Sequence, residues 1–419
     1  MSERTPTFVA LQHRNFRLLW VGQLLSMAGS LMQSAAVLWH VTLLVPEHKA
    51  LALGLTGLVR VVPIVVFSMI GGVVADALDR RKLMLVTQSL MTLCAAILAW
   101  LTFRGLSSVW PVYLLTALSS AAGSFDAPAR QSLVPALVPI KHLPNALSLN
   151  TIMFQAAAVI GPALAGPVIA GFGVGWAYAL NAVSFLAVIA SLLMMRDIPA
   201  RSDVGPKPEV SWAAAMEGLR FVFRAPLMRS TMLLDFFATF FSSATALLPL
   251  FAQDILHVGP HGYGWLLAAP AIGAVITGAA MARWEYKLQH RGKTLLRAVM
   301  VYGLATIGFG LSTSFALTFA CLAVTGAADT VSMVLRNIIR QLGTPDRLRG
   351  RMTSVNMIFF MGGPQLGEFE AGVVAQGFGA PFSVVTGGVG CLLATTFIAK
   401  ATPQLGELKR DVPVVVPEA

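Results

Sequence analysis

Residues 72–82 read Gly72-Val73-Val74-Ala75-Asp76-Ala77-Leu78-Asp79-Arg80-Arg81-Lys82 and join two long apolar runs of a 419-residue chain. The runs cover residues 51–76 and 83–104. Each is long enough to cross the hydrocarbon core of a bilayer, which needs about 20 apolar residues per helix. The charged end of the stretch cannot lie in hydrocarbon without a large cost in free energy. We therefore predict two membrane-spanning helices joined by a short loop in water.

The composition of the whole chain supports this interpretation. Hydrophobic residues make up 56% of the chain, charged residues only 12%, and the mean hydropathy is +0.73. Soluble domains carry about 25% charged residues, so this composition argues against a soluble enzyme or a disordered protein. Long apolar runs predict twelve spans. They are residues 15–44, 51–76, 83–104, 109–134, 145–172, 176–195, 226–255, 262–283, 294–314, 316–341, 352–378 and 380–400.

The net charge of +11 is explained by topology. Nearly all of the cations lie before the first run and after every even-numbered run, whereas the opposite side has only Lys49 and Arg104. The positive-inside rule then predicts that both termini are cytoplasmic, and no nucleic-acid partner is expected. The cytoplasmic cations include Arg14, Arg17, Arg80, Arg81, Lys82, Arg196, Arg201, Lys207, Lys287, Arg291, Lys293, Arg347, Arg349, Arg351, Lys409 and Arg410.

The chain divides into two related halves. A polar linker, residues 196–225, contains an expected amphipathic helix over Trp212–Arg224 and separates predicted bundles at 1–195 and 226–419. Four short patterns recur in the same order in both halves, as in many secondary transporters. They are Arg130-Gln131 with Arg340-Gln341, Ser148-Leu149-Asn150 with Ser354-Val355-Asn356, Gly161-Pro162-Ala163-Leu164 with Gly363-Pro364-Gln365-Leu366, and Gly171-Phe172-Gly173 with Gly377-Phe378-Gly379.

Residues 72–82 resemble the signature loop of the major facilitator superfamily, in which a glycine, an aspartate four residues later and a basic cluster follow one another. The resemblance covers essentially the whole chain. It implies an all-α membrane protein with twelve transmembrane helices in two pseudo-symmetric six-helix bundles. It also implies that Gly72, Asp76, Arg80 and Arg81 help close the cytoplasmic side against the region near Arg351–Ser354. The alternative is that Arg80–Lys82 only anchor the topology.

The fifth run resembles the antiporter motif of exporters in this superfamily. It contains Gly161, Pro162 and Gly166, with Ala157 and Ala165 where glycine is usual. The alternative is ordinary packing of small residues around a proline kink. The superfamily's arginine motif of the fourth span is absent, because residues 109–125 contain no cation. The proton-coupling role of that arginine is therefore not carried over to this chain. The antiporter-like motif of the fifth run favours export over uptake.

Two further segments resemble the bacterial drug and siderophore exporters, the subfamily of the enterobactin exporter and macrolide efflux proteins. They are Asn15-Phe16-Arg17-Leu18-Leu19-Trp20 and Arg349-Gly350-Arg351. This resemblance implies a multi-pass protein of the bacterial inner membrane, and a monomer is expected.

Ionisable residues within the runs are candidates for function, because charge in a bilayer is costly. They are Arg60, Asp235, Asp329, Arg336, Glu368 and Glu370. Polar residues also form stripes at helical spacing on spans 1, 7 and 10, which line the cavity in the superfamily. The stripes are Ser26, Ser30 and Gln33; Asp235, Thr239 and Ser242; and Thr325, Asp329, Ser332 and Arg336.

Two hypotheses follow from these charges. In the first, Asp235 or Asp329 carries the coupling proton, since a carboxyl group away from bulk water protonates more readily. Arg336 would hold Asp329 charged until the proton arrives, or either aspartate is a static partner of an arginine. In the second, Arg60 pairs with Glu368 or Glu370 and helps close the outer gate. The alternative is that one of these glutamates binds a cationic substrate or the proton.

Other chemistry finds little support in the sequence. Arg291-Gly292-Lys293-Thr294 lacks the first glycine of a phosphate-binding loop, and Gly259-Pro260 separates His257 from His261. We expect no cofactor, no metal and no enzymatic activity. The leading interpretation is a proton-coupled exporter of small amphipathic molecules. The alternatives are a lipid or lysophospholipid flippase, a solute importer, and a transport-inactive sensor or scaffold.

Overall fold

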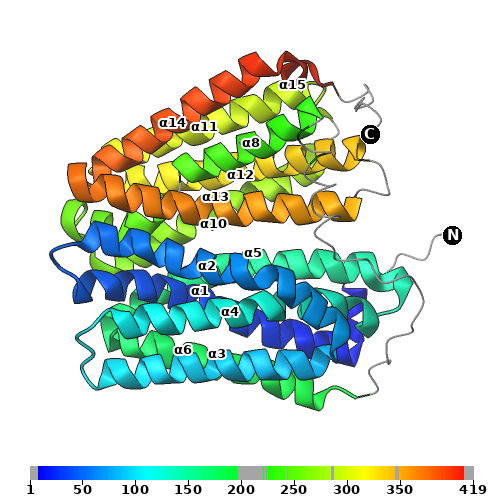
Figure 1. Cartoon of the computed structure of the whole chain (residues 1–419), viewed down its shortest axis with the longest axis vertical. Coiled ribbons are helices and arrows are strands. Elements are labelled where there is room, and N and C mark those ends of the chain that lie inside the picture. Colours follow the sequence, from blue (N-terminus) through cyan, green and yellow to red (C-terminus); the bar gives the residue numbers. More distant parts are fainter. Residues whose placement is uncertain are drawn as a thin grey trace. The chain divides into compact units, whose positions relative to one another are not determined.

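The structure, a computed structural model, describes residues 8–196, 220, 223, 225–242, 244–284, 287–344 and 349–409. The side chains of residues 68–77, 244, 349–351, 353–355 and 357–361 lie outside this description. All regular secondary structure in the described residues is helical (Figure 1). The amphipathic helix that we expect over Trp212–Arg224 falls almost entirely outside the described residues.

Long helices occupy the positions of the twelve apolar runs in the described part of the chain. Ten helical segments there are long and apolar enough to cross a membrane, whereas α4 and α13 carry more polar side chains. The long helices are α1 (Arg14–Leu44), α2 (Lys49–Ala77), α3 (Arg80–Phe103), α4 (Trp110–Leu133), α5 (Leu143–Phe172), α6 (Val174–Met194), α8 (Pro226–Phe241), α10 (Gly259–Trp284), α11 (Arg291–Leu311), α12 (Phe315–Gly343), α13 (Arg349–Phe378) and α14 (Ala380–Ala401).

The seventh predicted span is not one continuous helix. The helix α8 ends at Phe241, and a 3-10 turn (Ala244–Leu247), the short α9 (Leu248–Leu250) and a π-helical turn (Phe251–Ile255) follow it. Pro249 in α9 has no N–H group to donate to the preceding turn, which weakens a regular helix at this point. Hydropathy predicts the length of this segment but not its break.

The contacts divide the chain into two compact units. Unit 1 includes the described residues of Met1–Val45, Val59–Pro206 and Gly259–Ala268. In it, α1 packs against α5 and α6, and α3 packs against α4 and α6. Phe16, Leu19 and Met84 are among the fully buried side chains of its core. Unit 1 therefore contains most of the first six helices and the first residues of α10.

Unit 2 includes the described residues of Pro46–Leu58, Lys207–Val258 and Ala269–Ala419. In it, α8 packs against α13 and α14, and α11 packs against α12 and α14. Met228, Leu295 and Leu335 are fully buried in its core. The first residues of α2 thus belong to unit 2, and those of α10 belong to unit 1.

Candidate coupling site

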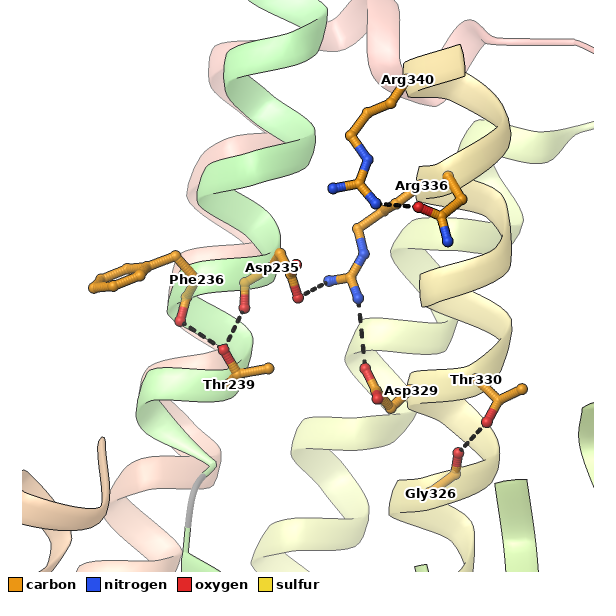
Figure 2. Close-up of polar contacts among 9 residues, drawn as sticks. Asp235, Phe236, Thr239, Gly326, Asp329, Thr330, Arg336 and Arg340 are labelled. Carbon is orange, nitrogen blue, oxygen red and sulfur yellow. Dashed lines mark hydrogen bonds and ion pairs between the residues drawn. The ribbon is translucent and has the colours of Figure 1, made fainter. Parts of the chain in front are cut away.

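A buried arginine of α12 lies between two aspartates in unit 2. The Arg336 Nη1 atom is 2.5 Å from Oδ1 of Asp235 on α8, and its Nη2 atom is 3.5 Å from Oδ1 of Asp329 on α12 (Figure 2). The exposed fraction of the side chain is 3% for Arg336 and 4% for Asp235, but 44% for Asp329. Arg336 therefore holds Asp235 closely in the interior, while Asp329 remains accessible.

The helical repeat brings these groups together. Asp329 and Arg336 are seven residues apart, or about two turns, so their side chains share one face of α12. The helix α8 packs beside α12 and supplies Asp235. A guanidinium offers separate N–H groups to two carboxylates, and such charge-assisted contacts are stronger than neutral ones. One contact can therefore loosen while the other is kept.

A second arginine lies one turn further along α12. Arg340 donates a hydrogen bond to the exposed side chain of Asn337, and its charge acts on Arg336 and Asp235 (Figure 2). It is eleven residues from Asp329, which corresponds to about 16 Å along the helix. Arg340 thus belongs to the end of the cluster away from Asp329.

A cavity of about 120 Å³ lies beside Asp329 within unit 2. The hydroxyl of Thr325 donates to the backbone oxygen of Leu322 at 2.7 Å, and that of Thr306 donates to the backbone oxygen of Tyr302 at 2.9 Å. Two residues of the predicted stripes, Ser242 and Thr325, therefore line the same space as Asp329. The polar lining consists of Ser242, Thr245, Tyr302, Thr306, Thr325 and Asp329.

Two other stripe residues of unit 2 make local contacts. Thr239 donates its hydroxyl to the backbone oxygens of Asp235 at 2.8 Å and Phe236 at 3.2 Å (Figure 2). Ser332 is only 2% exposed on α12. Both side chains therefore belong to the packed helices around the ion cluster.

The polar stripe of α1 lies in unit 1. Ser26 is buried, and Ser30 and Gln33 are half-buried. The Gln33 side-chain oxygen accepts a hydrogen bond from Asn181 of α6 at 2.8 Å. Gln33 thus contributes to helix packing, and a role for this stripe in lining a substrate cavity stays a prediction.

The residues of the predicted outer ion pair belong to different units. The Arg60 guanidinium donates to the backbone oxygen of Ser34 at 3.3 Å in unit 1. In unit 2, Glu368 is 8% exposed and lies against Gly57, where an added Cβ atom would be 3.0 Å from the glutamate Cβ. Glu370 is half-buried. The pairing of Arg60 with either glutamate stays a prediction.

The first residues of α3 contact the ends of α4 and α6 in unit 1. Arg80 donates to the backbone oxygen of Ser132 at 2.7 Å, and Arg81 donates to that of Leu193 at 3.2 Å. These carbonyls lie at the ends of α4 and α6, where cations are favourable. The side chains of Gly72 and Asp76 lie outside the described residues, so their gating role stays a prediction.

The small residues of the antiporter-like motif are sites of close helix packing. A Cβ atom on Gly161 would lie 2.6 Å from the backbone oxygen of Ala28 in α1. One on Gly166 would lie 2.7 Å from the backbone oxygen of Pro260 at the start of α10. Pro162 is a buried proline inside α5. Only small residues fit at these two glycine positions.

Unit 1 contains a buried acidic residue that is not among the candidates from the sequence. Asp126 of α4 forms an ion pair with Arg130, one turn later, and is fully buried. It also accepts hydrogen bonds from Thr87 at 3.0 Å and Gln88 at 2.9 Å. The internal repeat could have revealed Asp126. The 210-residue offset that aligns Arg130 with Arg340 also aligns Asp126 with Arg336, which is itself an ionisable residue within a run.

A histidine near the end of α1 was missed as well. Residues 35–42 are all buried, so every face of this part of the helix is covered. Within it, the Nδ1 atom of His40 is 3.1 Å from the hydroxyl oxygen of Tyr178 on α6. The hydroxyl of Tyr263, in α10, donates to the backbone oxygen of Ala35 at 2.9 Å. No stripe reveals His40, because its neighbours in sequence are apolar.

Known proteins resemble the chain over nearly its whole length. The sequence profile of a family described as transmembrane secretion effectors matches residues 5–412. The enterobactin exporter EntS of Escherichia coli O1:K1 / APEC is 25% identical over 406 residues, covering 96% of this chain and 95% of the relative.

Two solved structures share the fold. A bacterial homologue of the human lysosomal transporter Spinster, in an inward-facing and unoccupied conformation, matches with a TM-score of 0.73 and 15% identity over 94% of this chain and 98% of that chain. A bacterial homologue of the iron transporter ferroportin, in an inward-facing state, matches with a TM-score of 0.69 and 17% identity. The match covers 92% of this chain and 98% of that chain. These matches confirm the predicted all-α major facilitator fold.

Proposed function

The chain belongs to the family of transmembrane secretion effectors and is a secondary transporter of the major facilitator fold, and we propose that it exports small amphipathic molecules in exchange for protons. It is a multi-pass membrane protein that acts on a small-molecule substrate, and it is not an enzyme. The observation that carries the proposal is the Asp235–Arg336–Asp329 cluster. Buried charges cost folding free energy, so charged residues that are kept within membrane-spanning helices indicate a functional site.

The geometry suggests different roles for the two aspartates. Asp235 lies closer to Arg336 and is shielded, so it fixes the guanidinium. Asp329 is more exposed and further from the arginine, so it can take up and release a proton with less disturbance. When Asp329 is neutral, Arg336 keeps one carboxylate partner. The cluster can therefore change charge without leaving the arginine unpaired.

Alternating access requires contacts that can separate, and two glycine contacts fit this need. In unit 2, a Cβ atom on Gly372 would lie 2.6 Å from the Cα atom of Gly54. In unit 1, a Cβ atom on Gly264 would lie 2.8 Å from the backbone nitrogen of Gly166. Gly264 follows Gly54 by the 210-residue repeat offset. We propose that both contacts open and close during transport.

Polar contacts around the start of α2 can reinforce the contact in unit 2. Lys49 forms an ion pair with Asp254 at 3.2 Å, and both side chains are partly exposed. The side chain of Gln376 in α13 accepts from the backbone N–H of Leu51 at 3.3 Å and lies 3.1 Å from His48. Exposed pairs are weak, generally below about 1 kcal/mol, and therefore suit a contact that must break.

The direction and substrate class rest on similarity. EntS is named as an enterobactin exporter, and the small-residue pattern of α5 resembles that of antiporters. These points favour export of drugs or siderophores over uptake or lipid flipping. A transport-inactive sensor or scaffold would not need a charged cluster in its interior. We also propose a bacterial inner-membrane location, cytoplasmic termini and a monomer.

The proposal is tested in proteoliposomes with an imposed pH gradient. Panels of siderophores, macrolides and lysophospholipids identify the substrate, and substrate-dependent proton movement reports the coupling. We expect Asp329→Asn and Asp235→Asn to abolish gradient-driven accumulation, while Glu407→Gln, a change at an exposed carboxylate in α15 (Pro403–Glu407), leaves it intact. Normal gradient-driven transport by both aspartate variants would contradict the proposal.

A further inference from the structure

The wall of the cavity beside Asp329 carries several oxygen atoms and one carboxylate. The cavity lies between α8, the turn after it, and helices α10, α11 and α12. Asp329 is the middle residue of the 29-residue helix α12, yet its side chain is 44% exposed. Water-sized molecules therefore reach a carboxylate that is far from both ends of its helix.

Two hydroxyl groups of the wall can offer only lone pairs to an occupant. Thr306 and Thr325 use their hydroxyl hydrogens on backbone oxygens of their own helices, at 2.9 and 2.7 Å. A hydroxyl has one hydrogen to donate and two lone pairs to share. A carboxylate likewise has only lone pairs to offer. These three groups therefore favour an occupant that donates hydrogen bonds to them or carries a positive charge.

The carboxylate of Asp329 can attract one singly charged cation. Arg336 lies 2.5 Å from Asp235 and 3.5 Å from Asp329, so it mainly balances the former. Arg340 is further along α12 and bonds to Asn337. The negative charge of Asp329 is thus only partly balanced by Arg336. The described lining of the cavity contains one carboxylate, and its other side-chain oxygens are neutral hydroxyls, so a singly charged cation would balance its charge.

The size of the cavity excludes a drug-sized occupant. Its volume of about 120 Å³ corresponds to about four water molecules at roughly 30 Å³ each. Pockets for drug-sized ligands have about 300–1,000 Å³. A bare proton binds to a single oxygen atom, so it leaves the lone pairs of the other oxygen atoms in the wall unused. An alkali cation uses several oxygen ligands at once.

We propose that this cavity binds a small alkali cation, with Asp329 as its anionic ligand and Thr306 and Thr325 as neutral ligands. The proposal deepens the proposed function and rests on it only in assigning Asp329 to the coupling site. The cation and the proton then compete for the same carboxylate. Sodium, the alkali cation abundant outside cells, is the probe with which we test it.

The test measures thermal unfolding of the purified full-length protein in detergent. Sodium chloride is compared with N-methyl-D-glucamine chloride at equal ionic strength and constant pH. A ligand that binds only the folded state raises the unfolding temperature with the logarithm of its concentration above its Kd. We expect a saturable stabilisation by Na⁺ that weakens as the pH is lowered, because protons displace the ion from Asp329.

Variants distinguish a specific sodium site from a general effect of salt on the unfolding temperature. Asp329→Asn should abolish the sodium response, and Thr306→Val or Thr325→Val should raise the apparent Kd about tenfold, as expected for one lost ligand. Thr330→Val is the matched control, because the Thr330 hydroxyl makes the same kind of bond to Gly326, at 2.8 Å, but does not line the cavity (Figure 2). Its sodium response should stay unchanged.

The outcomes distinguish this inference from the proposed function. Equal unfolding temperatures in sodium and N-methyl-D-glucamine, or an unchanged sodium response in both threonine-to-valine variants at the cavity, would overturn the cation site. If proton-driven export persisted in that case, the proposed function would still stand. Sodium binding without any proton-driven export would instead leave the site intact and refute proton coupling.

Discussion

At the scale of single residues, Asp126 and Asp329 both lie within helices and both form an ion pair with an arginine. Asp126 in unit 1 is held by Arg130 and two hydrogen-bond donors, so its environment is closed and complete. Asp329 shares its arginine with Asp235 and borders a cavity. A closed ion pair suits a structural role, whereas a shared arginine beside a cavity can respond to a change in protonation.

Replacing the shared arginine tests this distinction. Arg336→Gln removes the partner of a buried aspartate, and breaking a buried pair costs about 3–5 kcal/mol of folding free energy. We expect a large loss of thermal stability together with loss of transport. The double variant Arg336→Gln/Asp235→Asn should regain stability without regaining transport.

The neighbouring arginine provides the control for that experiment. Arg340→Gln changes a half-buried residue that bonds to an exposed asparagine, so its effect on stability should stay below about 1 kcal/mol. Unfolding in detergent and transport in proteoliposomes are measured on all variants. Full transport by Arg336→Gln would show that the cluster serves packing only.

The sequence predicts which residues of the cluster matter but not how they share contacts. Helical spacing places Asp329 and Arg336 on one face and suggests their pairing. The closer partner, Asp235, comes from another helix, and the distance between two helices is not encoded in the spacing within either of them. The same reason explains why His40 and Tyr178 were missed, since their contact joins α1 to α6.

At the scale of helices, apolar length predicts the boundaries well. The predicted runs 83–104 and 380–400 differ from α3 and α14 by at most three residues at each end, because span length follows bilayer thickness. The break after Phe241 is not predicted, since it depends on backbone hydrogen bonding rather than hydropathy. Close glycine contacts are equally invisible to hydropathy.

Substitutions at two glycines in α13 and two glycines in α5 test the importance of these contacts. Gly372→Val and Gly166→Val insert side chains where an added Cβ atom already comes within 2.7 Å of backbone atoms. We expect both variants to reduce transport at least about tenfold, because the helices can no longer close. Gly377→Val and Gly171→Val are controls five residues further along the same helices, where an added Cβ meets no atom within 4 Å.

A second measurement separates loss of closure from loss of folding. A thiol cross-linker joins cysteines introduced at Lys49 and Asp254, after the three native cysteines are replaced by alanine. The cross-linking yield should fall with Gly372→Val and stay unchanged with Gly377→Val. Equal yields and equal transport in all four glycine variants would mean that the close contacts are incidental to transport.

At the scale of the whole molecule, the repeat predicts the architecture but not its asymmetry. The four repeated patterns predict two similar halves, as the fold requires. The charged residues depart from this symmetry, because Asp126 in one half corresponds to Arg336 in the other. A shared ion cluster therefore arises in unit 2, whereas unit 1 has a closed pair. We infer that coupling belongs to unit 2.

The orientation in the membrane decides which end of the chain faces the cytoplasm. Alternating access has no direction of its own, so the proton gradient determines the direction of a proton–substrate exchange. Cations concentrated at the ends of even-numbered spans predict cytoplasmic termini. Glu47, before α2, and Lys409, after α15, are both exposed and lie on opposite predicted sides. Single cysteines at these positions therefore report the orientation.

A membrane-impermeant maleimide should label Glu47→Cys in intact cells and Lys409→Cys only after permeabilisation, in a background without the three native cysteines. The reason is the positive-inside bias, which retains cationic loops in the cytoplasm. A carboxylate then binds its proton outside and releases it inside, which drives the substrate outward by exchange. The reverse labelling pattern would contradict the predicted topology. It would leave the direction of a proton–substrate exchange unchanged, because that direction follows from the proton gradient and not from the orientation of the protein.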